Sequence, residues 1–139
     1  DSLTVGETND PHISRMTVVS TGDAETLEQI EKQVRKLEDV KEVFKLEDTN
    51  SVYRELVLIK VECSHKERVD IVSIVDIYRG KIVDVSPDSM VIEITGTQSK
   101  IDGLLAMMTD FNVTEIVRTG IAGIGRGLRD EDKEKIKAR

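Results

Sequence analysis

The chain has 139 residues, of which 38% are hydrophobic, 3% aromatic and 34% charged, and it carries a formal net charge of −7 at pH 7. This length suits one ordinary domain or two small ones, with a core built from aliphatic side chains. The acidic balance disfavours nucleic acid as a partner, because no basic surplus is present to displace counterions from phosphates. No apolar stretch approaches the ~20 residues that cross a bilayer, so we expect no membrane partner.

The first third of the chain predicts two strands, a helix and a third strand. The first two strands are expected at 1–5 and 14–20, separated by a long hairpin loop at 6–13 that contains a proline. Asp23 is well placed as the N-cap of the helix. Apolar residues then recur at helical spacing, namely Leu27, Ile30, Val34 and Leu37. The third strand is expected at 41–46.

The second part of the chain predicts six elements in the order β-α-β-β-α-β. They are a strand at 56–63, a helix at 66–79 ended by Gly80, strands at 81–85 and 90–95, a helix capped by Thr97, and a strand at 113–119. Pro87 favours a tight turn between the two middle strands. This order is the split, ferredoxin-like arrangement, with two helices on one face of a four-stranded antiparallel sheet. The predicted fold class is therefore α+β.

An internal repeat relates the two parts at a fixed offset of 74 residues. Met16, Thr21, Gly22, Leu27, Ile30 and Val34 correspond in turn to Met90, Thr95, Gly96, Ile101, Leu104 and Met108. The sequence therefore predicts two ferredoxin-like modules, of which the first lacks its opening strand and helix. Such a fragment leaves one side of its sheet uncovered. We expect the native protein to begin about 20 to 30 residues earlier, the length of one strand and one helix.

Changes in composition predict the domain boundaries. The segment 47–51 is short and polar, as expected of a link between two packed modules. Beyond Gly127 most residues are charged, which indicates a tail that frays or forms a solvated helix. We expect an incomplete first domain at 1–48, a second domain at 49–127 and a charged tail at 128–139.

Residues with catalytic or metal-binding potential are sparse. His12 is expected in a turn and His65 at the start of a helix, and no second histidine or cysteine stands at ligand spacing. Cys63 is the sole cysteine and lies in an apolar run, so it is expected to be a buried free thiol. The sequence predicts no catalytic residues and no metal site.

The glycine segment near the end of the chain superficially suggests a phosphate cradle. Gly123, Gly125 and Gly127 surround Arg126, but a charged, non-periodic tail follows where a helix dipole would be needed. A strand exit or a flexible turn is the favoured interpretation.

Several short segments of the sequence are specific to one family. They are DSLTVG (1–6), SRMT (14–17), LEQIEKQ (27–33), REL (54–56), LIKV (58–61), YRGKIVDVS (78–86) and RTG (118–120). From Asp1 to about Gly127 the chain resembles the small regulatory subunit of acetohydroxyacid synthase, also called acetolactate synthase. The resemblance implies an N-terminal ACT domain, a ligand-sensing version of the split fold, followed by a second domain of related topology.

The resemblance also implies a function. Members of this family bind the thiamine-diphosphate-dependent catalytic subunit, raise its activity and confer feedback inhibition by valine or a related branched-chain amino acid. The small subunit is non-catalytic and holds no cofactor, whereas thiamine diphosphate, Mg and FAD are expected in the catalytic partner. A cytoplasmic location and a homodimer formed through the ACT domains are expected as well.

In this family the effector lies between two ACT domains of the dimer. Only Ser2 and Leu3 are expected to adjoin that pocket, because the other pocket positions would precede Asp1. Two other functions share the fold: a free-standing amino-acid-binding regulator of another protein, and a small enzyme on a ferredoxin-like scaffold. The small enzyme is disfavoured because no convergent polar cluster is indicated.

Overall fold

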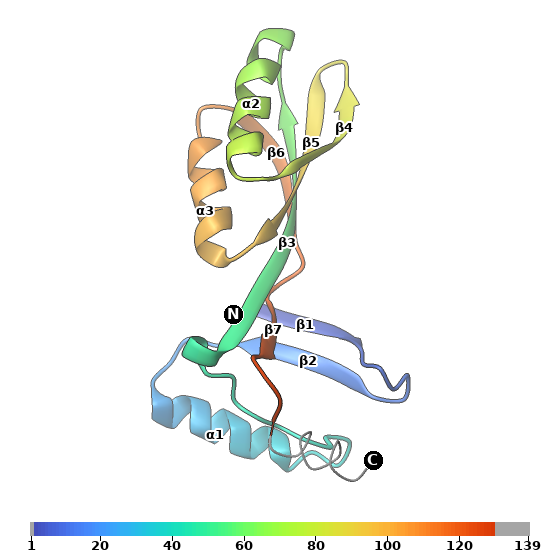
Figure 1. Ribbon diagram of the computed structural model, residues 1–139, viewed down its shortest axis with the longest axis vertical. Helices are drawn as coiled ribbons and strands as arrows, with labels where there is room; N and C mark the ends of the chain where they lie inside the picture. The colour runs from blue at the N-terminus through green and yellow to red at the C-terminus, as the bar shows by residue number, and fades with distance from the viewer. Residues whose placement is uncertain (1, 130–139) are drawn as a thin grey trace. The chain divides into compact units, whose positions relative to one another are not determined.

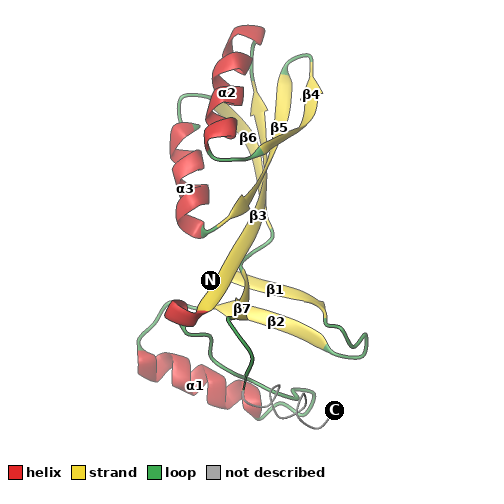
Figure 2. Cartoon of the chain, viewed as in Figure 1, coloured by secondary structure: helices red, strands yellow, loops and turns green. Residues whose placement is uncertain are grey.

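The computed structural model describes residues 2–129 and forms a mixed α+β fold (Figures 1 and 2). Its elements are β1 (Ser2–Glu7), β2 (Ser14–Val19), α1 (Ala24–Arg35), a 3-10 turn (Asp48–Asn50), β3 (Ser51–Glu62), α2 (His65–Ile77), β4 (Lys81–Ser86), β5 (Ser89–Gly96), α3 (Gln98–Met107), β6 (Asn112–Arg118) and β7 (Ala122–Gly125). Contacts within the chain define two compact units. The first comprises residues 1–52 with those from 123 onward, and the second comprises 53–122.

The second unit confirms the predicted ferredoxin-like arrangement. Its sheet has the order β4-β5-β3-β6 with antiparallel pairing throughout, and α2 and α3 cover one face (Figure 1). The inward side chains of β3 and β5 alternate with outward ones, as the two-residue period of a strand requires. The buried hydrophobic core consists of Val57, Ile59, Val61, Cys63, Ile71, Val75, Met90, Ile92, Ile94, Ile101, Leu104 and Met108. Every one of these residues belongs to the second unit.

Local signals fix both helices of the second unit. At the start of α2, Ser64 and Glu67 form a capping box in which each side chain accepts a hydrogen bond from the other residue's backbone N–H. At the start of α3, the Thr97 hydroxyl accepts a hydrogen bond from the N–H of Lys100 at 3.4 Å. The predicted cap at Thr97 is therefore confirmed.

The end of α2 differs from the prediction in one respect. The left-handed residue that ends the helix is Arg79, with φ 57°, and not Gly80. Gly80 serves a different purpose, because a Cβ there would lie 3.1 Å from Cγ1 of Val75 and 3.2 Å from the carbonyl oxygen of Glu93. Glycine at this position permits the backbone to pass close to the helix and to β5.

The first unit contains the antiparallel hairpin β1–β2 and helix α1. The helix is capped by Asp23, whose Oδ1 accepts a hydrogen bond from the N–H of Thr26 at 2.8 Å, as predicted. The strand predicted at 41–46 is wrong, because these residues, all within the described part of the chain, adopt no regular structure. In the split fold the last strand pairs with the first, as β6 pairs with β3. The described residues of the first unit supply no equivalent first strand for residues 41–46 to pair with.

The glycine segment also differs from the expected strand exit or flexible turn. Residues Ala122–Gly125 form β7, which pairs with β3. Gly123 is buried, and its carbonyl accepts a hydrogen bond from Nη2 of Arg15 at 2.9 Å. Most of the predicted charged tail, residues 130–139, lies outside the described residues, as does Asp1.

Candidate functional site

The two residues predicted to adjoin an effector pocket begin strand β1. Ser2 pairs with Val19 and Leu3 with Val18 of β2. Successive residues of a strand point to opposite faces, so Ser2 and Leu3 do not line the same surface. Ser2 is half-buried, whereas 55% of Leu3 is exposed.

Leu3 belongs to an uncovered apolar surface on the hairpin. The register places Leu3 opposite Val18 and Val5 opposite Met16, so all four side chains share one face. Their exposed fractions are 55%, 60%, 58% and 57%. We call these four residues the open face. A monomer seldom leaves such a set in water without a functional reason.

The second unit shows what the corresponding surface looks like when it is covered. Met90 and Ile92 stand 74 residues after Met16 and Val18, and they are 1% and 0% exposed. They lie on β5, which has β3 beside it and belongs to the sheet that α2 and α3 cover. In the described part of the first unit, α1 is the only α-helix. Within the described residues, the open face is not covered as its counterpart in the second unit is.

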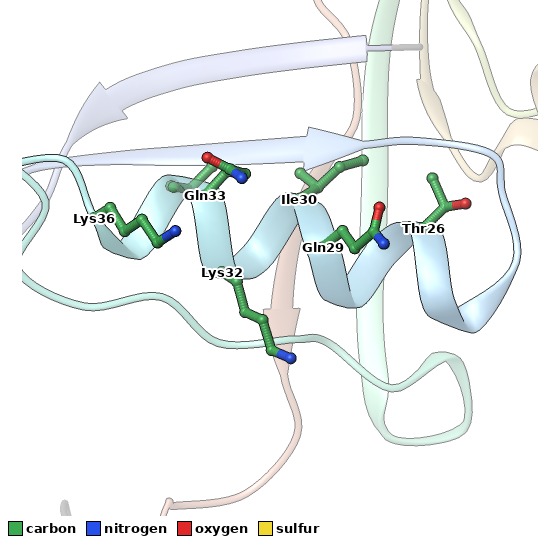
Figure 3. Close-up of a pocket in the computed structure, with 7 residues that line it drawn as sticks. Thr26, Gln29, Ile30, Lys32, Gln33 and Lys36 are labelled. Carbon is green, nitrogen blue, oxygen red and sulfur yellow. The ribbon is translucent and has the colours of Figure 1, made fainter.

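A shallow pocket lies along α1 (Figure 3). It is lined by Thr26, Gln29, Ile30, Lys32, Gln33, Val34 and Lys36. All of these residues except Val34 are exposed, and all come from the helix or its C-cap. Ile30 and Gln33 project from one side of the helix and Lys32 from the other. The pocket includes neither Ser2 nor Leu3, and a single helix surface cannot enclose a small ligand.

The ionisable groups considered from the sequence lie at structural positions: a helix cap, a turn, a helix start and the core. The pKa of Asp23 is lowered because its carboxylate accepts hydrogen bonds from the backbone and side chain of Thr26 at the start of α1. His12 lies in a turn, and His65 is the first residue of α2. Cys63 is a free thiol, 4% exposed, as predicted.

The described part of the chain shows neither a grouped metal site nor a helix that could span a membrane. Within residues 2–129, no three His, Cys, Asp or Glu side chains are grouped to hold a metal ion. No helix in this part is long and apolar enough to cross a membrane.

One ion pair was missed by the sequence analysis. Arg118 donates from Nε to Oε1 of Glu55 at 2.6 Å and from Nη2 to Oε2 at 3.2 Å, and Glu55 is only 5% exposed. The hydrogen bonds to Glu55 raise the pKa of Arg118. A signal for this pair exists in the sequence. Glu55 is in phase with the inward residues Val57 and Ile59, and a charge at an inward position requires a partner.

Two family models match the chain in succession. A model of the AHAS small subunit-like ACT domain matches residues 1–42. A model of the small subunit of acetolactate synthase matches residues 54–127.

Individual relatives give the same result. The acetolactate synthase small subunit of Haemophilus influenzae is 45% identical over 131 residues, which cover 94% of this chain and 80% of the relative. A probable acetolactate synthase small subunit of Methanothermobacter thermautotrophicus is 45% identical over 93% of this chain and 77% of its own length. The crystal structure of the Thermotoga maritima small subunit matches with a TM-score of 0.85 and 42% identity, over 92% of this chain and 80% of that one. This chain therefore belongs to the family of acetolactate synthase small subunits.

Proposed function

We propose that the chain is a non-catalytic regulatory subunit of acetolactate synthase. It binds the thiamine-diphosphate-dependent catalytic subunit, raises its activity and makes it sensitive to valine or a related branched-chain amino acid. The observation that carries this proposal is the succession of an ACT model and a small-subunit model along one chain that is 45% identical to named small subunits. ACT domains are ligand-sensing modules, so the first unit is the natural place for the effector.

The domain boundaries form part of the proposal. Residues 1–48 are an ACT domain without its opening strand and helix, 49–127 the second domain and 128–139 a charged tail. The exposed fractions of the open face support the incomplete first domain, because the corresponding second-unit residues Met90 and Ile92 are buried. In the intact protein a strand and a helix preceding Asp1 cover this face. They also provide the sheet partner for residues 41–46.

The proposed effector site also depends on the strand and helix proposed to precede Asp1. Leu3 and Ser2 adjoin a pocket between the ACT domains of a homodimer, and the remaining contacts come from residues before Asp1 and from the second protomer. The hairpin β1–β2 forms a sheet of two strands, both of them edge strands. Edge strands pair readily across a two-fold axis, which supports a dimer built by joining sheets. Binding of the effector would shift the equilibrium between arrangements of the two ACT domains at this dimer interface.

The catalytic cofactors belong to the partner in this proposal. Thiamine diphosphate, Mg and FAD are held by the large subunit, and this chain needs none of them in order to bind an amino acid. The small subunit supplies a coupling free energy, and about 1 to 3 kcal/mol suffices to change an affinity 5- to 150-fold. A cytoplasmic location remains a prediction.

Reconstitution tests the proposed function. The activity of the cognate catalytic subunit is measured alone and with the intact regulatory subunit, in the presence of valine, leucine or isoleucine. We expect activation on mixing and inhibition by at least one of the three amino acids. Absence of both effects would refute the proposal. Capture of an unrelated protein in place of the catalytic subunit would support the free-standing regulator.

A further inference from the structure

The chain passes from one compact unit to the other twice, at 52–53 and at 122–123. The first passage lies within β3, and the second lies within β7, which follows β6 and pairs with β3. Glu55 and Arg118 lie a few residues inside the second unit, one beside each passage. Any influence that travels through the covalent chain must use these two segments.

The two segments are fastened to each other within the second unit. Arg118 holds both carboxylate oxygens of Glu55, at 2.6 and 3.2 Å. One step further along, the N–H of Thr119 donates to the carbonyl oxygen of Leu56 at 3.1 Å, and the N–H of Leu56 donates to the hydroxyl of Thr119 at 3.2 Å. A two-bond Arg–carboxylate pair fixes orientation as well as distance. Together these contacts clamp β3 to the end of β6.

Gly120, the residue after these contacts, makes the connection to the first unit easy to deform. Gly120 has φ 91°, a backbone conformation that glycine adopts readily and other residues avoid. A connection that contains glycine can absorb a displacement through local rotation. The ladder between β3 and β6 is also irregular, because its register shifts between Lys60 and Val61. The clamp fixes the register on the side of this irregularity that leads to the passages.

We propose that the Glu55–Arg118 pair is a coupling device. It makes the two connections move together, so that effector binding in the first unit changes the second unit. This inference rests on the proposed function, because it assigns a route for the regulation proposed above. Glu55 and Arg118 are positioning residues in this scheme, and they contact neither effector nor substrate. Loss of the pair leaves both binding reactions intact and disconnects them.

The test measures coupling separately from binding. Valine is titrated into the intact regulatory subunit, alone and saturated with the catalytic subunit, and the ratio of the two dissociation constants is the coupling factor. In the wild type we expect a factor of about 5 to 150. In Glu55→Gln we expect the affinity of the free subunit for valine, and its affinity for the catalytic subunit, to stay within about twofold while the factor falls to about two or less. A purely structural role would weaken the two affinities themselves.

A matched control lies on the same two strands. Lys60 and Glu115 form an ion pair at 2.9 Å, with exposed side chains and at a distance in sequence from both passages. Glu115→Gln removes the same charge, and we expect it to leave the coupling factor unchanged. Arg118→Lys keeps the charge but loses the two-bond geometry, and we expect it to lower the factor.

Each outcome has a distinct meaning. A folded Glu55→Gln variant with the wild-type factor would overturn the proposal, as would an equal loss of coupling in Glu115→Gln. Thermal unfolding followed by circular dichroism identifies a variant that does not fold. If Glu55→Gln does not fold, Arg118→Lys decides the matter, and an unchanged factor in that variant overturns the proposal. A wild-type protein that binds neither valine nor the catalytic subunit refutes the proposed function before any variant is made.

Discussion

Met16 and Met90 hold the same position in two copies of one β-β-α pattern, yet 57% of Met16 is exposed and only 1% of Met90. Both side chains lie on the second strand of a hairpin, where each faces a strand partner, Val5 and Val85 respectively. The difference comes from the surroundings, because the sheet of the second unit has β3 beside the hairpin and two helices over it. The same residue type in the same register is therefore core in one unit and surface in the other.

Truncating these two methionines should have unequal effects. Met90→Ala removes a buried side chain and leaves a cavity, so we expect it to lower the free energy of unfolding by about 2–5 kcal/mol. Met16→Ala in the 139-residue chain should change it by less than about 0.5 kcal/mol. Urea unfolding followed by circular dichroism measures both. Equal losses would contradict the assignment of the open face as solvent-exposed in this chain.

A charge on the open face should distinguish the 139-residue chain from a longer one. Val18 is 60% exposed in the 139-residue chain, so Val18→Lys should change the free energy of unfolding little. In a longer chain with a strand and helix before this hairpin, the ammonium group of this lysine would be buried without a partner. We then expect a loss of several kcal/mol, because unpaired burial of a charge is costly. A neutral result in both chains would argue against a cover over this face.

The capping box at the start of α2 predicts a local stability effect. Ser64→Ala removes the acceptor for the N–H of Glu67, which lies 3.2 Å from the hydroxyl, and should cost about 1 kcal/mol. Ser73→Ala, in the exposed middle of the same helix, is the matched control. It should be neutral or slightly stabilising, because alanine has the higher helix propensity. Chemical unfolding of the two variants provides the comparison.

The cap of α1 predicts a pH dependence. The pKa of Asp23 is lowered in the folded chain, so the cap stabilises the helix above the ordinary pKa of the carboxyl group, and this contribution is lost as the pH falls through the lowered value. The amide proton of Thr26 should therefore shift in NMR spectra with a midpoint below the ordinary pKa of an aspartate carboxyl group. Asp23→Asn should abolish this titration. A midpoint above the ordinary value would contradict the hydrogen bond from Thr26 to Asp23.

The sequence was sufficient for elements whose signals are local. The caps at Asp23 and Thr97 were predicted from residue type, and both form the expected hydrogen bonds. The β-α-β-β-α-β order followed from hydrophobic periodicity, since the inward residues of β3 and β5 and the stripe on α3 are in phase. Ser2 and Leu3 were named from the family resemblance alone, and their role stays a prediction.

The misses depend on contacts that are distant in sequence. Residues 41–46 have the composition of a strand, but a strand also requires its partner, and the described residues of the first unit supply no equivalent of β3. Strand β7 was overlooked because glycine lowers strand propensity, although β3 offers it a free edge. Glu55 and Arg118 stand in two separate segments of the sequence, and neither segment by itself indicates the contact.

The burial of Cys63 gives the protein a built-in reporter. Its thiol is 4% exposed, and its N–H donates to the carbonyl oxygen of Asp88 at 2.9 Å, which ties the end of β3 to the β4–β5 turn. A thiol reagent can reach this sulfur only when the second unit opens. Because the chain contains no other cysteine, the rate of alkylation reports that opening directly, with no engineered probe and no signal from elsewhere in the molecule.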